Sequence, residues 1–460
     1  MVQKVLLVKS PIKYPVKIQG DGGDVGIPLN LLYLGAYLRE KSKVQVVIKD
    51  YRLEKARKNS FDLERDFQNF DVIATGACTS EYNEALRIMK IAKNMGKTTI
   101  MGGIFPTFNS SLVLSSGVVD YVVRGEGEIT LNNLINSLDQ HSNPKDLKGI
   151  SFIENGEIID NPRPNLIHNL DDLPMPAYDL ISLKDYMPFT SGAIYSSRGC
   201  NNACNFCSLS RMWNFSLRQR SPENIIKELK IYEDAGFKRV HFKDESVTLD
   251  LEFTKGLFKK LENSGLKLNY KVKSRIDQVT PEVLEQMVLA GVDTIHTGVE
   301  SFSQSELNRV KKGIDASIIR GNITSILDAG IKVNPVYIFG LPGQTESDLE
   351  ITSKNIQEIG SNPNVITYIS FMTPHPGTLS KDGLEIISKN LDRYTHKQPV
   401  CYPLSLGPGA VNKMVDKYHE LSRVTNSRFV NPPIDTDYLR VALKSVENKY
   451  NVNSPELVAS

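Results

Sequence analysis

Short apolar, β-branched runs alternate with longer amphipathic stretches along most of the chain. In the first 140 residues, five runs have the length and composition of buried strands: Lys4–Val8, Val44–Ile48, Asp71–Thr75, Thr98–Met101 and Val118–Val123. Apolar residues at helical spacing predict helices between them, over Pro28–Lys41, Glu81–Met95 and Thr130–Asp139. This alternation indicates a parallel sheet covered on both faces, with ligands expected at the carboxyl ends of its strands.

The same alternation returns from residue 191. Six further strands are predicted at Ala193–Ser197, Arg239–Phe242, Asn269–Lys273, Thr294–Val299, Lys332–Phe339 and Val365–Phe371. Helices are predicted between them over Pro222–Ala235, Leu251–Asn263, Pro281–Ala290, Ala316–Ala329 and Glu346–Ile359. Six βα repeats would build an open, partial barrel, and active sites of such barrels lie at the strand carboxyl ends.

These patterns divide the chain into four parts. Residues 1–140 form a Rossmann-like or flavodoxin-like unit, and residues 141–190, punctuated by prolines, are expected to be a linker with at most a small hairpin near Gly149–Ile159. Residues 191–378 form the partial barrel. Residues 379–460 form a short tail with one amphipathic helix, Ala410–Arg423. The fold class is therefore α/β, a parallel sheet followed by a (βα)6 partial barrel and a helical tail.

Composition and charge narrow the functional classes. The chain has 460 residues, 40% of them hydrophobic, and a formal net charge of +2, so no overall field draws it to nucleic acid. The apolar stretch at the N-terminus is too short for a signal sequence or a membrane-spanning helix, and no long apolar run follows. We therefore expect a cytoplasmic protein with no membrane span and no nucleic-acid partner.

Three of the five cysteines stand within eight residues, as Cys200, Cys204 and Cys207 in a CxxxCxxC run directly after the first barrel strand. Three thiolates this close can each bind a different iron of one iron–sulfur cube, whose fourth iron would stay open to a further ligand. Zinc is the main alternative, completed by Cys401 or a histidine, but structural zinc sites usually pair two knuckles and no second knuckle exists. An odd cysteine number makes a disulfide framework a poor explanation.

With Phe206 before the last cysteine, this run resembles that of the radical S-adenosylmethionine (SAM) superfamily. Further segments similar to that family follow in order: Phe242–Glu245, Lys273–Asp277, Thr297–Ser301 and Ile338–Thr345. The resemblance implies a 4Fe-4S cluster on the three cysteines and reductive cleavage of SAM to a 5′-deoxyadenosyl radical. It also implies SAM contacts from Phe206, Asp244, Glu245, Ser274, Arg275 and Glu300, with Glu300 on the ribose. From the residues alone, Glu300 and Arg275 could equally be strand-end ion pairs, and Asp244 or Glu245 a helix cap.

Two segments of the first domain, Met101–Thr107 and Asp120–Glu128, resemble the cobalamin-binding domain that precedes the radical domain in one large subfamily. The resemblance implies cobalamin contacts from residues after three strands: Thr79, Ser80, Gly102, Gly103, Phe105, Pro106, Thr107, Arg124, Gly125, Glu126 and Gly127. One departure stands out, because the loop after the first strand, Lys9–Tyr14, lacks the cobalt-ligating histidine of many cobalamin proteins. No histidine occurs before His141. A domain that kept the fold and lost the ligand is the alternative.

The resemblance favours a cobalamin-dependent radical methyltransferase that methylates an unactivated carbon of a small-molecule or peptide substrate. Its reductant would be a protein such as flavodoxin or ferredoxin. The alternatives are the same radical chemistry without methyl transfer (cyclisation, rearrangement or oxidation), a methylthiotransferase, or a non-catalytic iron–sulfur module. His375, His396 and His419 are candidate acids or bases near the substrate, and Cys78 and Cys401 are expected to be buried structural residues.

Overall fold

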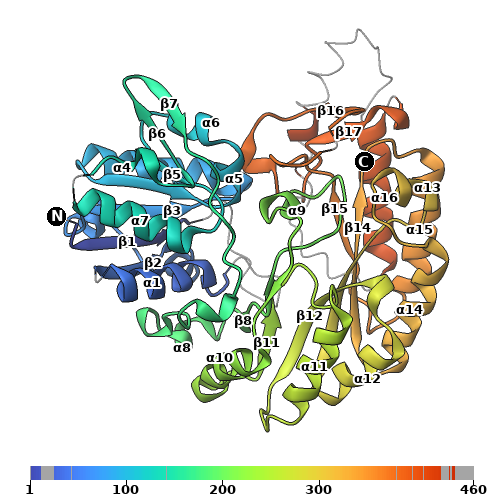
Figure 1. Cartoon of the computed structure of the whole chain (residues 1–460). Coiled ribbons are helices and arrows are strands. Elements are labelled where there is room, and N and C mark those ends of the chain that lie inside the picture. The colour runs from blue at the N-terminus through green and yellow to red at the C-terminus, as the bar shows by residue number, and fades with distance from the viewer. Residues whose placement is uncertain are drawn as a thin grey trace.

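The computed structural model describes residues 2–11, 25–42, 44–140, 142–379, 381–395, 397–407, 409–425, 435 and 438–440. Two α/β units lie side by side, an N-terminal sheet flanked by helices and a curled sheet wrapped by helices on its outer side (Figure 1). No described helix combines the length and the apolar character needed to cross a membrane.

The N-terminal sheet contains the five predicted strands, all parallel, in the order β2-β1-β3-β4-β5. Their bounds are β1 Lys4–Lys9, β2 Gln45–Asp50, β3 Val72–Gly76, β4 Thr98–Gly102 and β5 Tyr121–Val123. Alternate residues of β1 enter separate cores: Leu7 packs on the side of α1 (Leu29–Lys41) and α7 (Gly127–Asp139), whereas Leu6 packs on the side of α4 (Tyr82–Asn94). Burial on both faces explains why these strands are almost wholly apolar.

Four short helices complete this domain and were not predicted, because segments of five or six residues carry too little periodicity. They are α2 Tyr51–Ala56, α3 Leu63–Phe67, α5 Ile104–Phe108 and α6 Ser110–Leu114. Helix α7 also begins three residues earlier than the pattern predicts.

Residues 141–190 are more structured than the expected linker. A hairpin of β6 (Ile150–Glu154) and β7 (Glu157–Asp160) adds two antiparallel strands to the edge of the first sheet, beside β5. Its two-residue turn is Asn155-Gly156, and both residues have positive φ (52° and 83°). An Asn-Gly pair is the strongest short sequence signal for a hairpin. Further along, α8 (Leu183–Tyr186) ends on Tyr186, whose hydroxyl donates to Asp50 at 2.9 Å. The segment therefore docks onto the first domain instead of only connecting it.

The six predicted barrel strands form one parallel sheet in chain order, β8-β11-β12-β13-β14-β15. Their bounds are β8 Gly192–Ile194, β11 Arg239–Phe242, β12 Asn269–Arg275, β13 Val292–Glu300, β14 Lys332–Phe339 and β15 Tyr368–Phe371. The helices on the outside are α10 Pro222–Ala235, α11 Leu251–Glu262, α12 Pro281–Leu289, α14 Ala316–Asp328 and α15 Glu346–Gly360. Two shorter ones, α9 Leu209–Met212 and α13 Gln304–Arg309, follow β8 and β13.

Helix α10 shows why these boundaries follow from sequence. The Ser221 side chain accepts from the Asn224 amide, Pro222 occupies the first turn, and Gly236 ends the helix in the left-handed conformation. Each is a local signal that needs no tertiary context.

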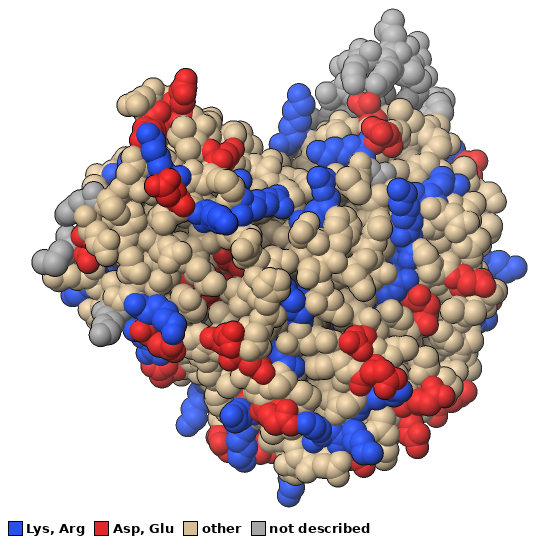
Figure 2. Space-filling view, viewed as in Figure 1, with Lys and Arg blue, Asp and Glu red and all other residues tan. Residues whose placement is uncertain are grey.

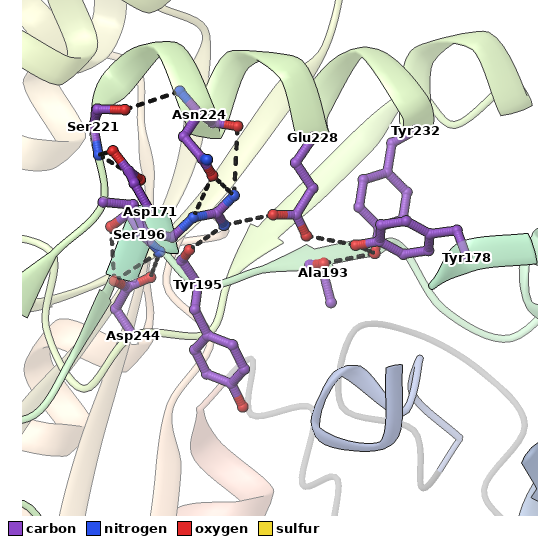
Figure 3. A network of polar contacts seen from close by, with 11 residues as sticks. Asp171, Tyr178, Ala193, Tyr195, Ser196, Ser221, Asn224, Glu228, Tyr232 and Asp244 are labelled. Atoms are coloured by element: carbon purple, nitrogen blue, oxygen red, sulfur yellow. Dashed lines mark hydrogen bonds and ion pairs between the residues drawn. The ribbon is translucent and has the colours of Figure 1, made fainter. Parts of the chain in front are cut away.

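A buried polar network fixes the first barrel strand against α10 (Figure 3). The Arg220 guanidinium donates to the Tyr195 carbonyl at 2.8 Å and to Glu228, which also accepts from the Tyr178 hydroxyl. The Tyr232 hydroxyl donates to the Ala193 carbonyl at 2.6 Å. Because Tyr178 comes from the segment before the barrel, the network joins that segment, β8 and α10 in one place.

The tail contributes a small hairpin, β16 Leu384–Ile386 and β17 Cys401–Pro403, and then helix α16 Ala410–Val424 as predicted. Helix α16 packs against α15, and its Tyr418 ring lies 5.5 Å from that of Phe371 on β15. The apolar core of the first domain continues without interruption into that of the barrel.

Candidate active site

The cysteine loop begins at Gly199, directly after the short strand β9 (Ser197–Arg198). Gly199 has φ 104°, and a Cβ there would overlap the carbonyl oxygen of Ser216, so no other residue fits. The loop is also held from the far side of the barrel, because the Asn205 amide donates to the Val310 carbonyl at 3.1 Å. Its path is thus fixed by backbone contacts.

Cys200, Cys204 and Cys207 are all partly exposed along this loop, and none forms a disulfide. Burial raises the pKa of Cys207 to about 11. Burial also raises the pKa of Cys204, although the nearby Lys312 ammonium lowers it. A bound cation would favour both thiolates.

Within the described part of the chain, no three His, Cys, Asp or Glu side chains are arranged around a single metal ion. Three thiols spread along one loop suit a four-iron cluster better than a single metal ion. Each thiol binds a different iron of the cluster, so the three need not point at one atom. The donor set therefore fits an iron–sulfur cluster.

Glu300 and Arg275 lie beside this loop, and Lys312 links them. The Glu300 carboxylate pairs with the Lys312 ammonium at 2.6 Å, and the Arg275 guanidinium donates to the Lys312 carbonyl at 2.9 Å. The charges of Lys312, Glu300 and Arg275 all act on the pKa of the Cys204 thiol. Sequence reasoning missed Lys312, whose only signal is its position in the Lys311-Lys312-Gly313 turn after α13.

Glu300 ends β13 in a strained conformation, with φ 66° and a shift in strand register beside Gly298. A Cβ on Gly298 would lie 2.5 Å from the Glu300 carboxylate and 2.9 Å from the Lys312 ammonium. The missing side chain at Gly298 therefore makes room for the turned-back carboxylate.

The remaining predicted SAM contacts have protein partners of their own. Arg275 binds Asp277 through two hydrogen bonds of 3.0 and 2.9 Å, and Ser274 lies 2.8 Å from Thr248. Asp244, fully buried, accepts from the Ser196 amide and from the Ser196 and Ser197 hydroxyls. Glu245 accepts from the Trp213 indole at 2.9 Å. Phe206 packs into a small apolar cluster with Val310, Leu341, Met372 and Cys401.

A cavity of about 310 Å³ lies between the two domains. The first domain lines it with strand ends, including Gly76, Gly102, Gly103, Gly125, Glu126 and Gly127, and with the apolar residues Leu7, Leu31, Leu34, Ile100, Val123 and Leu131. The barrel side lines it with Tyr195, Ser197, Arg198, Leu209, Met212, Trp213 and Glu245. Five of the predicted cobalamin contacts thus face the same space as the loops around the cysteines.

The glycines of this cavity fit a bulky flat ligand. Gly103 has φ 94°, and a Cβ there would lie 3.0 Å from backbone atoms of Ala77. Thr107 joins the two glycine segments, since its hydroxyl donates to the Gly103 carbonyl and accepts from the Gly125 amide. The cradle is therefore made of closely packed glycine backbone that lines the cavity without adding side chains to it, which suits a corrin ring.

The other predicted cobalamin contacts do not line the cavity. Thr79 lies 2.9 Å from the His375 imidazole, and Ser80 contacts Cys78. Phe105 and Pro106 are buried beneath the cradle, and Arg124 donates to the Asn161 carbonyl of the docked segment. Of the loop predicted to lack a cobalt ligand, Lys9–Tyr14, residues 12–14 lie outside the described residues.

Buried ion pairs close the domain interface beside the cavity. Arg198 binds Glu126 at 2.8 Å and Glu128 at 2.6 Å, and Arg218 binds Glu126 at 2.7 Å. The sequence does not predict a role for these arginines, because their partners lie about 70 to 90 residues away along the chain. Elsewhere, basic and acidic side chains intermix over most of the face in Figure 2, as the small net charge leads one to expect.

Two family models match the chain, the B12 binding domain over residues 18–135 and the radical SAM superfamily over residues 194–356. An uncharacterized methyltransferase of Pyrococcus horikoshii is 31% identical over 432 residues, which cover 90% of this chain and 91% of the relative. The chain belongs to this family of cobalamin-binding-domain radical SAM enzymes. The matches confirm the predicted fold class, the assignment as an enzyme and the cofactor set of a 4Fe-4S cluster, SAM and cobalamin.

Other members resemble this radical SAM enzyme over most of its length. The anaerobic magnesium-protoporphyrin IX monomethyl ester cyclase of Rubrivivax gelatinosus is 24% identical, covering 91% of this chain and 78% of the cyclase. Among solved structures, the radical SAM methyltransferase TsrM from Kitasatospora setae, with cobalamin and a [4Fe-4S] cluster bound, matches with a TM-score of 0.75 at 16% identity. That match covers 95% of this chain and 92% of TsrM. At that identity, the likeness concerns the fold alone.

Proposed function

We propose that this radical SAM enzyme transfers a methyl group to an unactivated carbon of a small molecule or peptide. The observation that carries the proposal is the cavity between the domains, because the glycine strand ends and the loops beside the cysteines face one space. When bound, the cluster with SAM supplies a carbon radical and cobalamin supplies the methyl group. A shared space is what methyl transfer between two cofactors requires.

The protein's own part is to hold and orient. In the proposal, Cys200, Cys204 and Cys207 hold the cluster, and Glu300, presented by its pair with Lys312, binds the ribose hydroxyls of SAM. The strand-end glycines let the corrin approach the backbone. We propose the domain division 1–140, 191–378 and 379–460, with residues 141–190 as a segment docked between them.

A second outcome has support from the relatives. A cyclase 24% identical to this chain matches 91% of its length, so ring formation by the same radical is the alternative. We further propose a cytoplasmic setting and a flavodoxin- or ferredoxin-type reductant, since radical formation consumes an electron.

The test begins with anaerobic purification in the presence of cobalamin and quantitation of iron, sulfide and corrinoid. About four irons and one corrinoid per chain are expected. The purified enzyme is then incubated with methyl-labelled SAM and small-molecule extracts. Label in a new carbon-bound methyl group supports methyl transfer, whereas a product without label supports the cyclase-type outcome.

The variant Cys204→Ala should lose the cluster's visible absorption and SAM cleavage. Cys401→Ala is the matched control, since Cys401 is a buried thiol that donates to the Met372 carbonyl and should leave both intact. Cluster absorption that persists in Cys204→Ala would contradict the assignment.

A further inference from the structure

The cysteine loop reaches the surface of the protein. Between its first two cysteines, Asn201 and Ala203 are exposed to solvent, whereas the cysteines themselves are partly exposed. The proposed function consumes an electron that has to come from another molecule, and a donor must approach the cluster closely to deliver it. The exposed side of the loop is a place where a donor can approach the three thiols.

Two other segments of the barrel hold this loop at Asn205. The backbone amide of Asn205 donates to the Val310 carbonyl at 3.1 Å, and its side-chain amide donates to the Arg309 carbonyl at 3.0 Å. The Asn205 carbonyl accepts from the Leu379 amide at 2.9 Å. The surface beside the loop therefore includes residues at the end of α13 and residues that follow β15.

Three short segments make up this surface: 199–212, which includes the loop, 308–313 and 377–383. Lys312 is buried in its ion pair. The other basic side chains of these segments are exposed, and the acidic residue among them is Asp382. We call these exposed basic side chains the basic rim: Arg211, Arg309, Lys311 and Lys381.

Most of the positive charge on the basic rim is not neutralised within the protein. Arg309 pairs with Asp348, whereas Arg211 donates to the carbonyl of Gly377, a neutral group, at 3.3 Å. Lys311 and Lys381 form no ion pair with any residue in the described part of the chain. The surface beside the cysteines is therefore positively charged, although the net charge of the whole chain is only +2.

The positive surface continues across the seam between the domains. The Arg163 guanidinium, from the docked segment, donates to the Arg211 carbonyl at 3.5 Å and lies 5.5 Å from the centre of the Phe108 ring on α5. Arg163 is exposed as well. In Figure 2, basic side chains gather along the upper part of this seam.

An exposed apolar side chain accompanies the basic rim. Leu379, whose amide binds the cysteine loop, is 53% exposed. Protein interfaces commonly combine an apolar centre with a polar rim. Electron-transfer complexes are among the smallest protein interfaces, so a surface of this size is sufficient for one.

We propose that the basic rim and Leu379 form the docking surface for the electron donor, a small acidic electron-transfer protein. The proposal rests on the proposed function, in which each radical formed consumes one electron. The cofactor of the donor loses this electron and the cluster gains it. Attraction between opposite charges raises the rate of encounter and makes that rate dependent on salt.

Binding is measured first, because it does not depend on methyl transfer. The anaerobic, cluster-loaded enzyme is titrated calorimetrically with an acidic bacterial flavodoxin and with an acidic bacterial ferredoxin, at low and at high ionic strength. Saturable binding of at least one of them is expected, and added salt should weaken it because salt screens the charges. If neither protein binds, the proposal is overturned, whatever the enzyme methylates.

The double variant Lys311→Glu/Lys381→Glu reverses two charges of the basic rim. With the protein donor that binds, formation of 5′-deoxyadenosine from SAM should slow about tenfold at low ionic strength, and the affinity for that donor should fall. With reduced methyl viologen, a small cationic donor that needs no docking surface, the rate should be at least that of the parent. Lys311→Arg/Lys381→Arg should keep the parent's affinity and rate with both donors.

The matched control is Lys238→Glu/Lys332→Glu. Both lysines are exposed at the amino ends of barrel strands, Lys238 just before β11 and Lys332 at the start of β14, on the opposite end of the barrel from the cysteines. This variant should bind the donor as the parent does. Unchanged donor affinity in Lys311→Glu/Lys381→Glu would overturn the proposal. An equal loss of rate with methyl viologen would also overturn it, because the two lysines would then act on the SAM site itself.

Discussion

The two sheets of this enzyme present different surfaces to the sites that they build. The strand ends of the first sheet offer glycines and an apolar wall of leucine, isoleucine and valine. The inner face of the barrel offers lysine, histidine and arginine side chains in layers. We therefore expect the first sheet to select its ligand by space and backbone, and the second by charge. Substitutions that add side-chain volume should therefore disturb the site on the first sheet. Substitutions that change charge should disturb the site on the barrel.

The loop between these surfaces should respond most strongly to added volume. Gly199→Ala places a Cβ on the Ser216 carbonyl oxygen at φ 104°, so the cysteine loop cannot keep its path. We expect less than about a tenth of the parent's iron and sulfide content, measured after anaerobic reconstitution.

Gly256→Ala is the control, because it lies on α11 with open space around its Cβ and should retain the cluster. Full iron content in Gly199→Ala would show that the loop path is not what positions the thiols.

On the barrel side, a buried carboxyl should make stability depend on pH. Burial and Asp348 raise the pKa of Glu306 to about 7, although hydrogen bonds from Ser301 and Gln344 oppose the shift. A raised carboxyl pKa favours the folded state below the unfolded value of about 4.5, and this contribution is lost as the pH rises through about 7. The shift corresponds to about 3 kcal/mol. Glu306→Gln should therefore remove most of the loss of thermal stability between pH 5 and pH 8.

Melting temperatures of the parent and the variant at both pH values test this. Glu346→Gln, at an exposed position on α15, should keep the parent's pH dependence. If Glu306→Gln shows the parent's pH dependence, Glu306 is not the titrating group.

The smallest effect is expected at the corrin cradle. Gly103→Ala adds one methyl group about 3.0 Å from the Ala77 backbone, so we expect corrinoid affinity to fall about tenfold while iron content stays unchanged. Trp213, the single tryptophan of the chain, lines the cavity and reports binding through quenching of its fluorescence by the corrinoid.

Gly26→Ala, with nothing within 4 Å of its Cβ, should bind corrinoid as the parent does. Unchanged affinity in Gly103→Ala would place the corrin elsewhere.

Local signals made most of the fold predictable. Caps such as Ser221-Pro222 and Thr280-Pro281 mark where helices begin, and six of six barrel strands follow from apolar runs. The sequence predicts at most a small hairpin near Gly149–Ile159, because the surrounding prolines suggest a linker. The Asn155-Gly156 pair, however, is a strong local signal for the β6–β7 hairpin. The three cysteines were identifiable because all of them lie in one short segment.

The rest of the site depends on contacts that sequence does not encode locally. Four contacts join separate elements: Arg275 with the Lys312 carbonyl, Asp244 with the Ser196 hydroxyl, Lys312 with Glu300, and Arg198 with Glu126. His241, Lys273 and His296 come from three strands, so their neighbourhood became visible only once strand register was known.

Arg198 has a consequence for the order in which the enzyme is assembled. It stands next to Gly199, at the root of the cysteine loop, while its guanidinium is bound by Glu126 and Glu128 at the edge of the corrin cradle. Ordering one site therefore lowers the entropy cost of ordering the other. By thermodynamic linkage, binding at either site raises the affinity of the other by the same factor. A chain loaded with corrinoid should accept its cluster more readily, and a chain loaded with its cluster should retain corrinoid longer.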